Sequence, residues 1–271
     1  MNGFLRFLLS YLVFILPAAH PGGLPQDSVG AATNTGMRVP VVLELFTSEG
    51  CSSCPPADAL LAKLEEQQPV AGAEIIALEE HVDYWDHQGW VDPFSSGQWT
   101  QRQQDYASGF GTRSVYTPEL VVNGRSGFVG SHEGDAFRAV AGAAAQPRTP
   151  MSLTLLKSEK RDHEHLKVEV GKLQGGQAGD VAEVWLAITE KALHSAVLGG
   201  ENSGHDLRHA AVVRWLHKTG TADSNAAAAF TGESDLKLDS AWKRTNLRVV
   251  AFVQEKRSRH ILGAASARVE P

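Results

Sequence analysis

The chain lacks the sequence patterns that mark several common classes of protein. Its 25 basic and 31 acidic residues give a formal net charge of -6, and no long run of like charge offers a surface for nucleic acid. The sequence has no Gly-x-Ser-x-Gly elbow, phosphate-binding loop, dinucleotide-binding glycine pattern or His-Glu-x-x-His helix. Nucleic-acid binding, hydrolase, nucleotide-binding and zinc-protease functions therefore have no support.

Long hydrophobic runs are scarce as well. The apolar run at residues 7–16 is well short of the roughly 20 residues that cross a bilayer. It follows Arg6 and precedes the small residues 17–19, an order typical of a secretory signal peptide. We expect residues 1–19 to be that signal and residues 20–38, rich in Gly, Pro, Ser and Thr, to be a flexible leader. The protein is thus predicted to be exported, either periplasmic or secreted, and anchored if the signal is not cleaved.

Cysteine is almost absent, because Cys51 and Cys54 are the only two in 271 residues. They lie between an apolar run at residues 40–47 and a helical pattern that begins at Pro55. The first turn of a helix presents unpaired N–H groups and the positive end of the helix dipole, which favour thiolate over thiol. The placement therefore suggests a redox-active dithiol.

A static disulfide and a metal site are the alternatives for this pair. In the chain-entropy model, closing a loop of four residues stabilises by about 2 kcal/mol, against about 4.7 kcal/mol for a loop of a hundred residues. The pair is therefore a poor structural cross-link, even in an oxidising compartment. Cys-x-x-Cys also suits soft ions such as Cu(I), with a nearby histidine as a third ligand. Redox chemistry is the interpretation that we favour.

Hydrophobic patterns divide the rest of the chain into two predicted domains. In the first, residues 39–148, buried strands are predicted at 41–46, 73–78 and 119–124, a short strand at 127–129, and helices at 55–68, 98–106 and 134–145. In the second, residues 149–271, short β-prone segments alternate with polar turns. These segments are 152–156, 166–170, 182–189, 211–217, 236–238, 247–254 and 261–269.

The order of these features resembles the thioredoxin fold, in which Cys-x-x-Cys lies at a strand–helix turn and a cis-proline precedes a later strand. Pro118, after Thr117, stands in that context, so the resemblance implies a cis bond there. More closely, the chain resembles an exported bacterial thioredoxin-like family, domain of unknown function 1223 (DUF1223). The matching stretches are 43–58, 81–86, Gly89-Trp90, 116–118, Glu201-Asn202, Gly204 and 212–214. The predicted fold class is an α/β thioredoxin-like domain followed by a mostly antiparallel, sandwich-like β domain.

The resemblance to thioredoxins also implies roles for individual residues. Cys51, expected to be the more exposed thiol, would attack a substrate disulfide, and Cys54 would resolve the mixed disulfide. Pro118 would face the pair. Glu44, which interrupts an apolar strand, would shuttle protons to the resolving thiol. The alternative for Glu44 is a carboxylate satisfied by backbone N–H groups at the strand edge.

Residues 81–90 are dense in groups that bind metals, sugars or peptides. His81 and His87, with two aspartates, could ligate a metal, but an aromatic and polar loop at a domain interface is commoner, and we predict no metal site. Trp85 and Trp90, together with Thr117, are the predicted substrate-binding residues. These tryptophans belong to a predicted insertion, about residues 80–114, which forms either a lid or substrate platform at the dithiol or the packing between the two domains.

The remaining histidines are predicted to be solvated surface groups, because they lack a third ligand at a suitable spacing. They include His163, His165, His205 and His209.

Together these observations predict an exported thiol–disulfide oxidoreductase that acts on protein disulfides or dithiols, with a redox partner protein and no cofactor. The alternative is a non-enzymatic binding protein in which Cys51 and Cys54 capture copper, as Cu(I), or form a static disulfide. The two intervening serines carry no positive charge, so the direction of the redox chemistry stays open.

Overall fold

The computed structural model describes residue 1 and residues 38–270, except 157, 159 and 161. The predicted signal peptide and nearly all of the predicted leader lie outside the described residues. Among the described residues, no helix is both long and apolar enough to cross a membrane.

The secondary structure agrees with most of the elements predicted from hydrophobic spacing. The first half of the chain contains β1 (Val39–Thr47), α1 (Pro55–Gln67), β2 (Ala73–His81), α2 (Gly97–Gly109), β3 (Glu119–Val122), β4 (Ser126–Val129) and α3 (Glu133–Ala144). The second half contains β5 (Met151–Leu156), β6 (His163–Gly171), β7 (Ala182–Glu190), β8 (Leu193–Ala196), β9 (Asp206–His209), β10 (Val212–Ala222), β11 (Ala228–Lys237), a 3-10 turn (Arg244–Asn246), β12 (Leu247–Glu255) and β13 (Ile261–Arg268).

Helix α1 begins and ends for identifiable reasons. Pro55 and Pro56 occupy its first positions, where a missing N–H costs no hydrogen bond, directly after Cys54 as the N-cap residue. At the other end Gln68 adopts a left-handed conformation, with φ of 49°, and its N–H bonds the carbonyl of Leu64. The chain then turns back into β2. The helix predicted over residues 55–68 is therefore confirmed.

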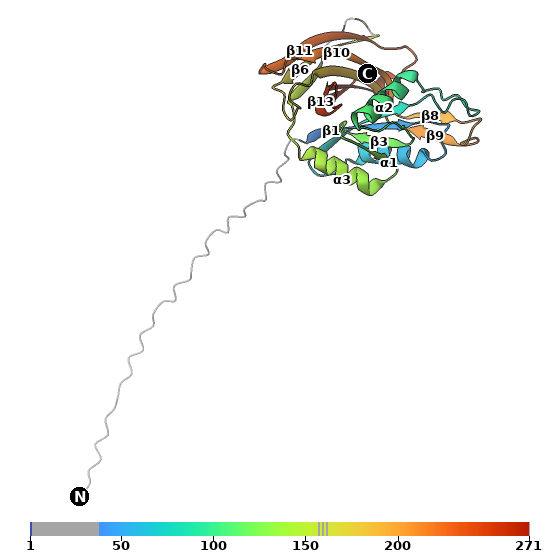
Figure 1. Ribbon diagram of the computed structural model, residues 1–271, viewed down its shortest axis with the longest axis horizontal. Helices are drawn as coiled ribbons and strands as arrows, with labels where there is room; N and C mark the ends of the chain where they lie inside the picture. The colour runs from blue at the N-terminus through green and yellow to red at the C-terminus, as the bar shows by residue number, and fades with distance from the viewer. Residues whose placement is uncertain (2–37, 157, 159, 161, 271) are drawn as a thin grey trace. The chain divides into compact units, whose positions relative to one another are not determined.

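One large mixed sheet runs through both halves of the chain (Figure 1). Its strand order is β13-β12-β7-β10-β2-β1-β3-β4. Strand β2 is parallel to β1 on one side and to β10 on the other, and the other neighbouring pairs are antiparallel. The junction between the halves is short: Val212 of β10 pairs with Glu79 of β2, and the Glu79 N–H donates to the Ala211 carbonyl at 2.9 Å.

The predicted fold class is wrong. The chain is not an α/β thioredoxin-like domain followed by a separate β domain, because the two sets of strands share this eight-stranded sheet. Strands make up 42% of the described residues and helices 18%, so the protein is mostly β. The described residues from 38 to 270 belong to one compact unit. The physical reason is that β2 keeps an open edge toward β10, and an unpaired edge in the middle of a buried sheet must find a partner.

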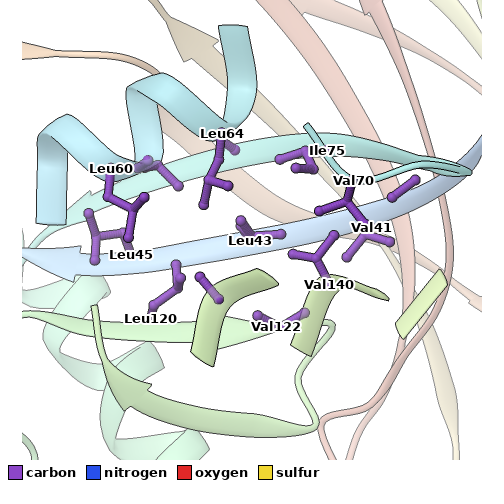
Figure 2. Close-up of a cluster of buried hydrophobic side chains, with 14 of the residues drawn as sticks. Val41, Leu43, Leu45, Leu60, Leu64, Val70, Ile75, Leu120, Val122 and Val140 are labelled. Atoms are coloured by element: carbon purple, nitrogen blue, oxygen red, sulfur yellow. The ribbon is translucent and has the colours of Figure 1, made fainter. Parts of the chain in front are cut away.

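Three hydrophobic clusters hold the layers together. Helices α1 and α3 pack on one face of β1, β2 and β3, where Leu43, Leu45 and Leu64 are buried (Figure 2). Further along the sheet, β7 and β12 pack against the small sheet β11-β6-β5. Helix α2 covers the opposite face and contributes Trp99 and Tyr106 to a cluster with residues of β1, β2, β7 and β12. That third cluster joins side chains from both predicted domains, so the interface between them is continuous core.

Candidate functional site

The two cysteines form a disulfide at the N-terminal end of α1. Strand β1 ends at Thr47, and the loop 48–54 carries the pair to the helix. The Cys54 carbonyl accepts the N–H groups of Ala57 and Asp58, at 2.8 and 3.2 Å, so the sulfur pair lies where the helix dipole is positive. The predicted disulfide between Cys51 and Cys54 is confirmed.

Both sulfurs are covered in this oxidised state. Cys51 and Cys54 are each 0% exposed, whereas Ser52 and Ser53 between them are exposed. The expectation that Cys51 is the more exposed thiol is therefore wrong. The Ser53 Oγ lies 3.3 Å from the Cys51 Sγ, and because a disulfide sulfur has no proton, the hydroxyl is the donor.

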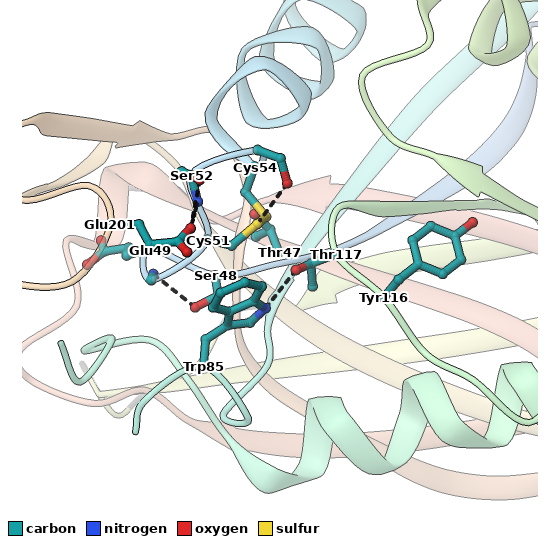
Figure 3. The surroundings of a disulfide bond; sticks show 12 residues. Thr47, Ser48, Glu49, Cys51, Ser52, Cys54, Trp85, Tyr116, Thr117 and Glu201 are labelled. Atoms are coloured by element: carbon teal, nitrogen blue, oxygen red, sulfur yellow. Dashed lines mark hydrogen bonds between the residues drawn. A yellow bond between two sulfur atoms is a disulfide. The ribbon is translucent and has the colours of Figure 1, made fainter. Parts of the chain in front are cut away.

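Two residues from the second half of the chain, Glu201 and Asn202, form hydrogen bonds with residues 48–54, the dithiol loop. The Glu201 Oε2 accepts the Ser52 N–H at 3.0 Å and the Ser52 hydroxyl at 2.6 Å, as Figure 3 shows. Those bonds lower the pKa of the Glu201 carboxyl. The buried Asn202 side chain donates to the carbonyls of Glu49 and Cys51 at 2.9 and 3.0 Å. These hydrogen bonds fix the conformation of the loop that carries the disulfide.

Two of the residues predicted to bind substrate, Trp85 and Thr117, meet beside the disulfide. The Trp85 Nε1 donates to the Thr117 Oγ1 at 2.8 Å beside the disulfide (Figure 3). The bond between Thr117 and Pro118 is cis, as the resemblance to thioredoxins implied. Both Trp85 and Thr117 are half-buried, while Pro118 is buried.

Trp90 reaches the site through a buried carboxylate. Its Nε1 donates to the Glu49 Oε2 at 2.8 Å, and Glu49 precedes Cys51 by two positions. The loop that follows β2 thus contacts the dithiol loop at Glu49, whose N–H also donates to Asp92 Oδ2 at 2.8 Å. The rest of the predicted insertion has a different role, because α2 packs into the core. The segment therefore both borders the site and joins the two halves of the protein.

Alternation along the strands divides the buried polar residues into two groups. Neighbouring side chains of a strand point to opposite faces of the sheet. In β1, Leu43, Leu45 and Thr47 face α1, and in β2 Glu79 and His81 lie on that same face. Glu44 in β1 and Glu80 in β2 face α2 instead. The α1-face cluster comprises Glu49, Asp58, Glu79, His81, Asp92 and His209, and the α2-face cluster comprises Glu44, Glu80, Arg102, Tyr106 and Gln254.

The α1-face cluster is built around two histidines. The His209 Nε2 and Nδ1 lie 2.9 Å from Glu49 Oε1 and 2.8 Å from Glu79 Oε1. The His81 Nδ1 lies 2.7 Å from Asp92 Oδ2, and its Nε2 lies 3.6 Å from Glu79 Oε1. All of these side chains are buried. The prediction that His209 is a solvated surface group is therefore wrong.

Burial and charge shift the proton affinities of this cluster. Burial opposes protonation of His209, but its hydrogen bonds to Glu49 and Glu79 outweigh that effect and raise its pKa to about 9. Burial also raises the pKa of Asp58 to about 7, and the charge of Glu79 adds to the shift. The Thr47 hydroxyl donates to the Asp58 Oδ1 at 2.7 Å. Asp58 lies one turn after Cys54, on the side of α1 that faces the sheet.

Glu44 does not lie beside the dithiol. It forms an ion pair with Arg102, at 2.5 Å between Oε2 and Nε, and accepts a short hydrogen bond from the Tyr106 hydroxyl. Glu80 shares Arg102 at 3.4 Å, and burial together with the charge of Glu44 raises the pKa of Glu80 well above its ordinary value. The large sheet separates this α2-face cluster from α1, so the geometry does not bring Glu44 to the resolving thiol.

Comparison with known proteins places the chain in a family. A sequence profile of the family described as "Protein of unknown function (DUF1223)" matches residues 42–254. The chain belongs to this family. Among curated proteins, no significant match was found.

Two solved structures share the fold of this DUF1223 protein. A crystal structure of a protein from Agrobacterium tumefaciens is 25% identical, with a TM-score of 0.63, and the match covers 86% of this chain and 98% of that one. The structure of HBP35 of Porphyromonas gingivalis is 18% identical, with a TM-score of 0.62, and covers 86% and 76% of the two chains. The fold of this chain is therefore shared by other bacterial proteins.

Sequence reasoning missed several residues of the site in this DUF1223 protein. Glu79 carried no visible signal, because an acidic residue near a strand end is ordinary. Glu49, Asp58 and Asn202 lie in stretches that resemble the family, and that resemblance was the available hint. His209 was passed over because its partners Glu49 and Glu79 lie 160 and 130 positions away in the chain.

Proposed function

We propose that this DUF1223 protein is an exported thiol–disulfide oxidoreductase that exchanges the Cys51–Cys54 disulfide with dithiols or disulfides of other proteins. The observation that carries the proposal is the disulfide at the first turn of α1, with the Ser53 hydroxyl on the Cys51 sulfur. In the reduced state that hydroxyl and the positive helix end stabilise a Cys51 thiolate, the species that attacks disulfides.

The reaction has two exchange steps. The Cys51 thiolate attacks one sulfur of a substrate disulfide, forms a mixed disulfide and expels the other substrate sulfur as a thiolate. The Cys54 thiol then attacks the Cys51 sulfur, breaks the mixed disulfide and re-forms the internal disulfide, and its proton passes to the departing substrate thiolate. The substrate gains two electrons and the protein loses two. The reverse sequence oxidises a substrate dithiol.

A polypeptide substrate fits the surroundings of the pair. Tyr116 is exposed next to Thr117, and the half-buried Trp85 lies beside the dithiol loop (Figure 3). Trp90, also half-buried, donates a hydrogen bond to Glu49 of that loop. Aromatic side chains with one polar end are common where proteins bind other proteins. Because both sulfurs are covered, exchange requires the segment of Glu201 and Asn202 to separate from the loop.

Export and a thioredoxin-like chemistry belong to the same proposal. The apolar run at residues 7–16, after Arg6, supports export. Cys-x-x-Cys at a strand–helix turn, with Thr117-Pro118 nearby, supports the exchange chemistry of the thioredoxin-like superfamily. The proposal rests on this local arrangement and needs no separate thioredoxin-like domain.

A redox titration combined with trapping tests the proposal. The purified protein is equilibrated in glutathione buffers of graded potential, and the two thiols are counted by alkylation and mass spectrometry. The variant Cys54→Ser is expected to hold a protein substrate as a mixed disulfide on Cys51, whereas Cys51→Ser holds none. A potential below about -300 mV, with nothing trapped by Cys54→Ser, identifies a static disulfide and overturns the proposal. Cu(I) binding that requires Cys51 favours the copper alternative.

A further inference from the structure

The α1-face cluster contains three side chains that converge on one point. Glu79 and His81 lie two positions apart in β2, so their side chains share a face of the sheet, and His209 ends β9 above them. One ligand atom from each of the three lies within 4.8 Å of the others. His81 and His209 meet edge to face, with ring centroids 4.7 Å apart.

The outward-facing nitrogen of each histidine is held by a carboxylate. The His81 Nδ1 bonds Asp92 and the His209 Nε2 bonds Glu49. When a carboxylate accepts the N–H of one ring nitrogen, the other ring nitrogen is turned inward and is free to bind an ion, which is the arrangement that metal-binding histidines show. The inward atoms are the His81 Nε2 and the His209 Nδ1, and both point to the same oxygen of Glu79.

The Glu79 carboxylate is anchored in the same way. Its Oε2 accepts the backbone N–H groups of Ala210 and Ala211, at 2.8 and 3.3 Å. Its Oε1 is left to face the two inward nitrogens, at 2.8 Å from His209 and 3.6 Å from His81. Each of the three potential ligands is thus positioned by a partner outside the point of convergence.

One of the inward atoms has no hydrogen-bond partner. The His81 Nε2 belongs to a side chain that is 0% exposed, and no hydrogen bond within the described part of the chain satisfies it. A buried polar atom of this kind destabilises the folded protein unless something binds it. A ligand with empty orbitals at the point of convergence removes that destabilising effect.

We propose that Glu79, His81 and His209 form a zinc-binding site. Two imidazoles and a carboxylate are a ligand set that Zn²⁺ takes in proteins, at bond lengths of about 2.0–2.2 Å. Tetrahedral coordination at those lengths places ligand atoms about 3.3–3.6 Å apart. From Glu79 Oε1 the His81 Nε2 lies 3.6 Å away and the His209 Nδ1 lies 2.8 Å away, and all three atoms lie within 4.8 Å of one another, so side-chain shifts that even out these separations complete the site.

Binding is an exchange of protons for the ion. In the metal-free cluster, the His209 Nδ1 hydrogen-bonds Glu79 Oε1, and Zn²⁺ takes the place of the proton between them, which is released to solvent. The proton on the His209 Nε2, which is hydrogen-bonded to Glu49, stays in place. The cysteines donate nothing, because both sulfurs are in the disulfide. The site is therefore independent of the proposed exchange reaction.

Because the ligands are buried, the ion enters as the chain folds. The test begins with protein produced in zinc-supplemented medium, desalted, and analysed for metal by mass spectrometry. One zinc per chain is expected for the wild-type protein and for His87→Ala, a control histidine that is exposed in the neighbouring loop. His81→Gln and His209→Gln are expected to carry none. Asp92→Asn, which removes only a positioning carboxylate, is expected to weaken zinc binding by about 10- to 100-fold.

Cobalt substitution provides a readout that does not depend on variants that fold poorly. Wild-type protein loaded with Co²⁺ is expected to show the visible bands of a tetrahedral nitrogen and oxygen site, without a thiolate charge-transfer band. The variant Cys51→Ser/Cys54→Ser is expected to keep its zinc. Metal that is lost with the cysteines, or wild-type protein that carries no zinc, overturns the proposal. Neither result bears on disulfide exchange, which the trapping experiment measures separately.

Discussion

Glu44 of β1 forms an ion pair with Arg102 of α2 on the face of the large sheet opposite to α1, with both side chains buried. Removing one partner leaves a buried charge without compensation, so Arg102→Met is expected to destabilise the protein by about 3–5 kcal/mol. The double variant Glu44→Gln/Arg102→Met is expected to lose less than the sum of the two single changes. Urea denaturation measures all four proteins, and strictly additive losses contradict the coupling.

The same relationship predicts what Glu44 does not do. Because the sheet lies between Glu44 and the dithiol, Glu44→Gln is expected to leave the pH dependence of disulfide exchange unchanged in the molecules that fold. The measurement is the rate at which the reduced protein attacks a small disulfide. The rate is followed from about pH 5 to about pH 9, a range that includes both the ordinary thiol pKa and the lowered values found at helix N-termini. A shift of the profile in the Glu44 variant restores the proton-shuttle role expected from the sequence.

The bonds from Glu201 to Ser52 predict the rate at which the disulfide opens. Glu201→Ala removes the acceptor of the Ser52 N–H and hydroxyl, so a small thiol reductant is expected to reach the Cys51–Cys54 disulfide severalfold faster. The matched control is Asp206→Ala, an exposed acidic residue of β9 that contacts His194 and not the dithiol loop. Equal reduction rates for the wild-type protein and both variants mean that the contact does not gate access.

Replacement of two glycines by alanine is expected to change the stability of the protein in opposite directions. Gly142 lies inside α3 with open space around the position of a Cβ atom, so Gly142→Ala is expected to stabilise by about 0.5–1 kcal/mol. Gly124 has φ of +63°, and an added Cβ lies 1.9 Å from the Arg259 carbonyl oxygen, so Gly124→Ala is expected to destabilise by about 2–5 kcal/mol. Thermal or denaturant unfolding of the two variants checks the opposite signs.

The hydrogen bonds that Asp180 accepts predict that the folded protein loses stability in acid. It accepts the backbone N–H groups of Val181, Arg257 and Ser258 at 2.8, 3.0 and 2.9 Å. Burial alone raises the pKa of this carboxyl, but these bonds outweigh it and lower the pKa below its ordinary value. The ionised form is therefore the stabilising one. Its contribution is present above the unfolded pKa and is lost as the pH falls through the lowered pKa of the folded state.

The variant Asp180→Asn isolates that contribution. At neutral pH it is expected to be less stable than the wild-type protein by about 1–2 kcal/mol, because a neutral amide accepts these bonds less well. The difference is expected to shrink toward zero at the most acidic pH at which both proteins still fold. If the difference in stability between the two proteins stays constant across the acid range, the pKa of the Asp180 carboxyl is not lowered by folding, which contradicts the prediction.

The local elements could be predicted because their signals are short-range. The prolines at 55 and 56 and the leucines at 60, 61 and 64 specify a helix wherever the chain goes afterwards. The continuous apolar run of β1 likewise specifies a strand that is buried on both faces. For the same reason the Cys51–Cys54 disulfide could be expected, since both cysteines lie within one turn of chain.

The sequence by itself determined the helices, most of the strands and the dithiol at the start of α1, because neighbouring residues decide those features; β8 and β9 were not predicted. Only the tertiary structure decided that β10 pairs with β2, which turned two expected domains into one sheet. The same pairing carries His209 to Glu79, 130 positions earlier, and sets the buried cluster beneath α1. Which distant strands pair depends on how whole faces pack, and no window of sequence contains that information.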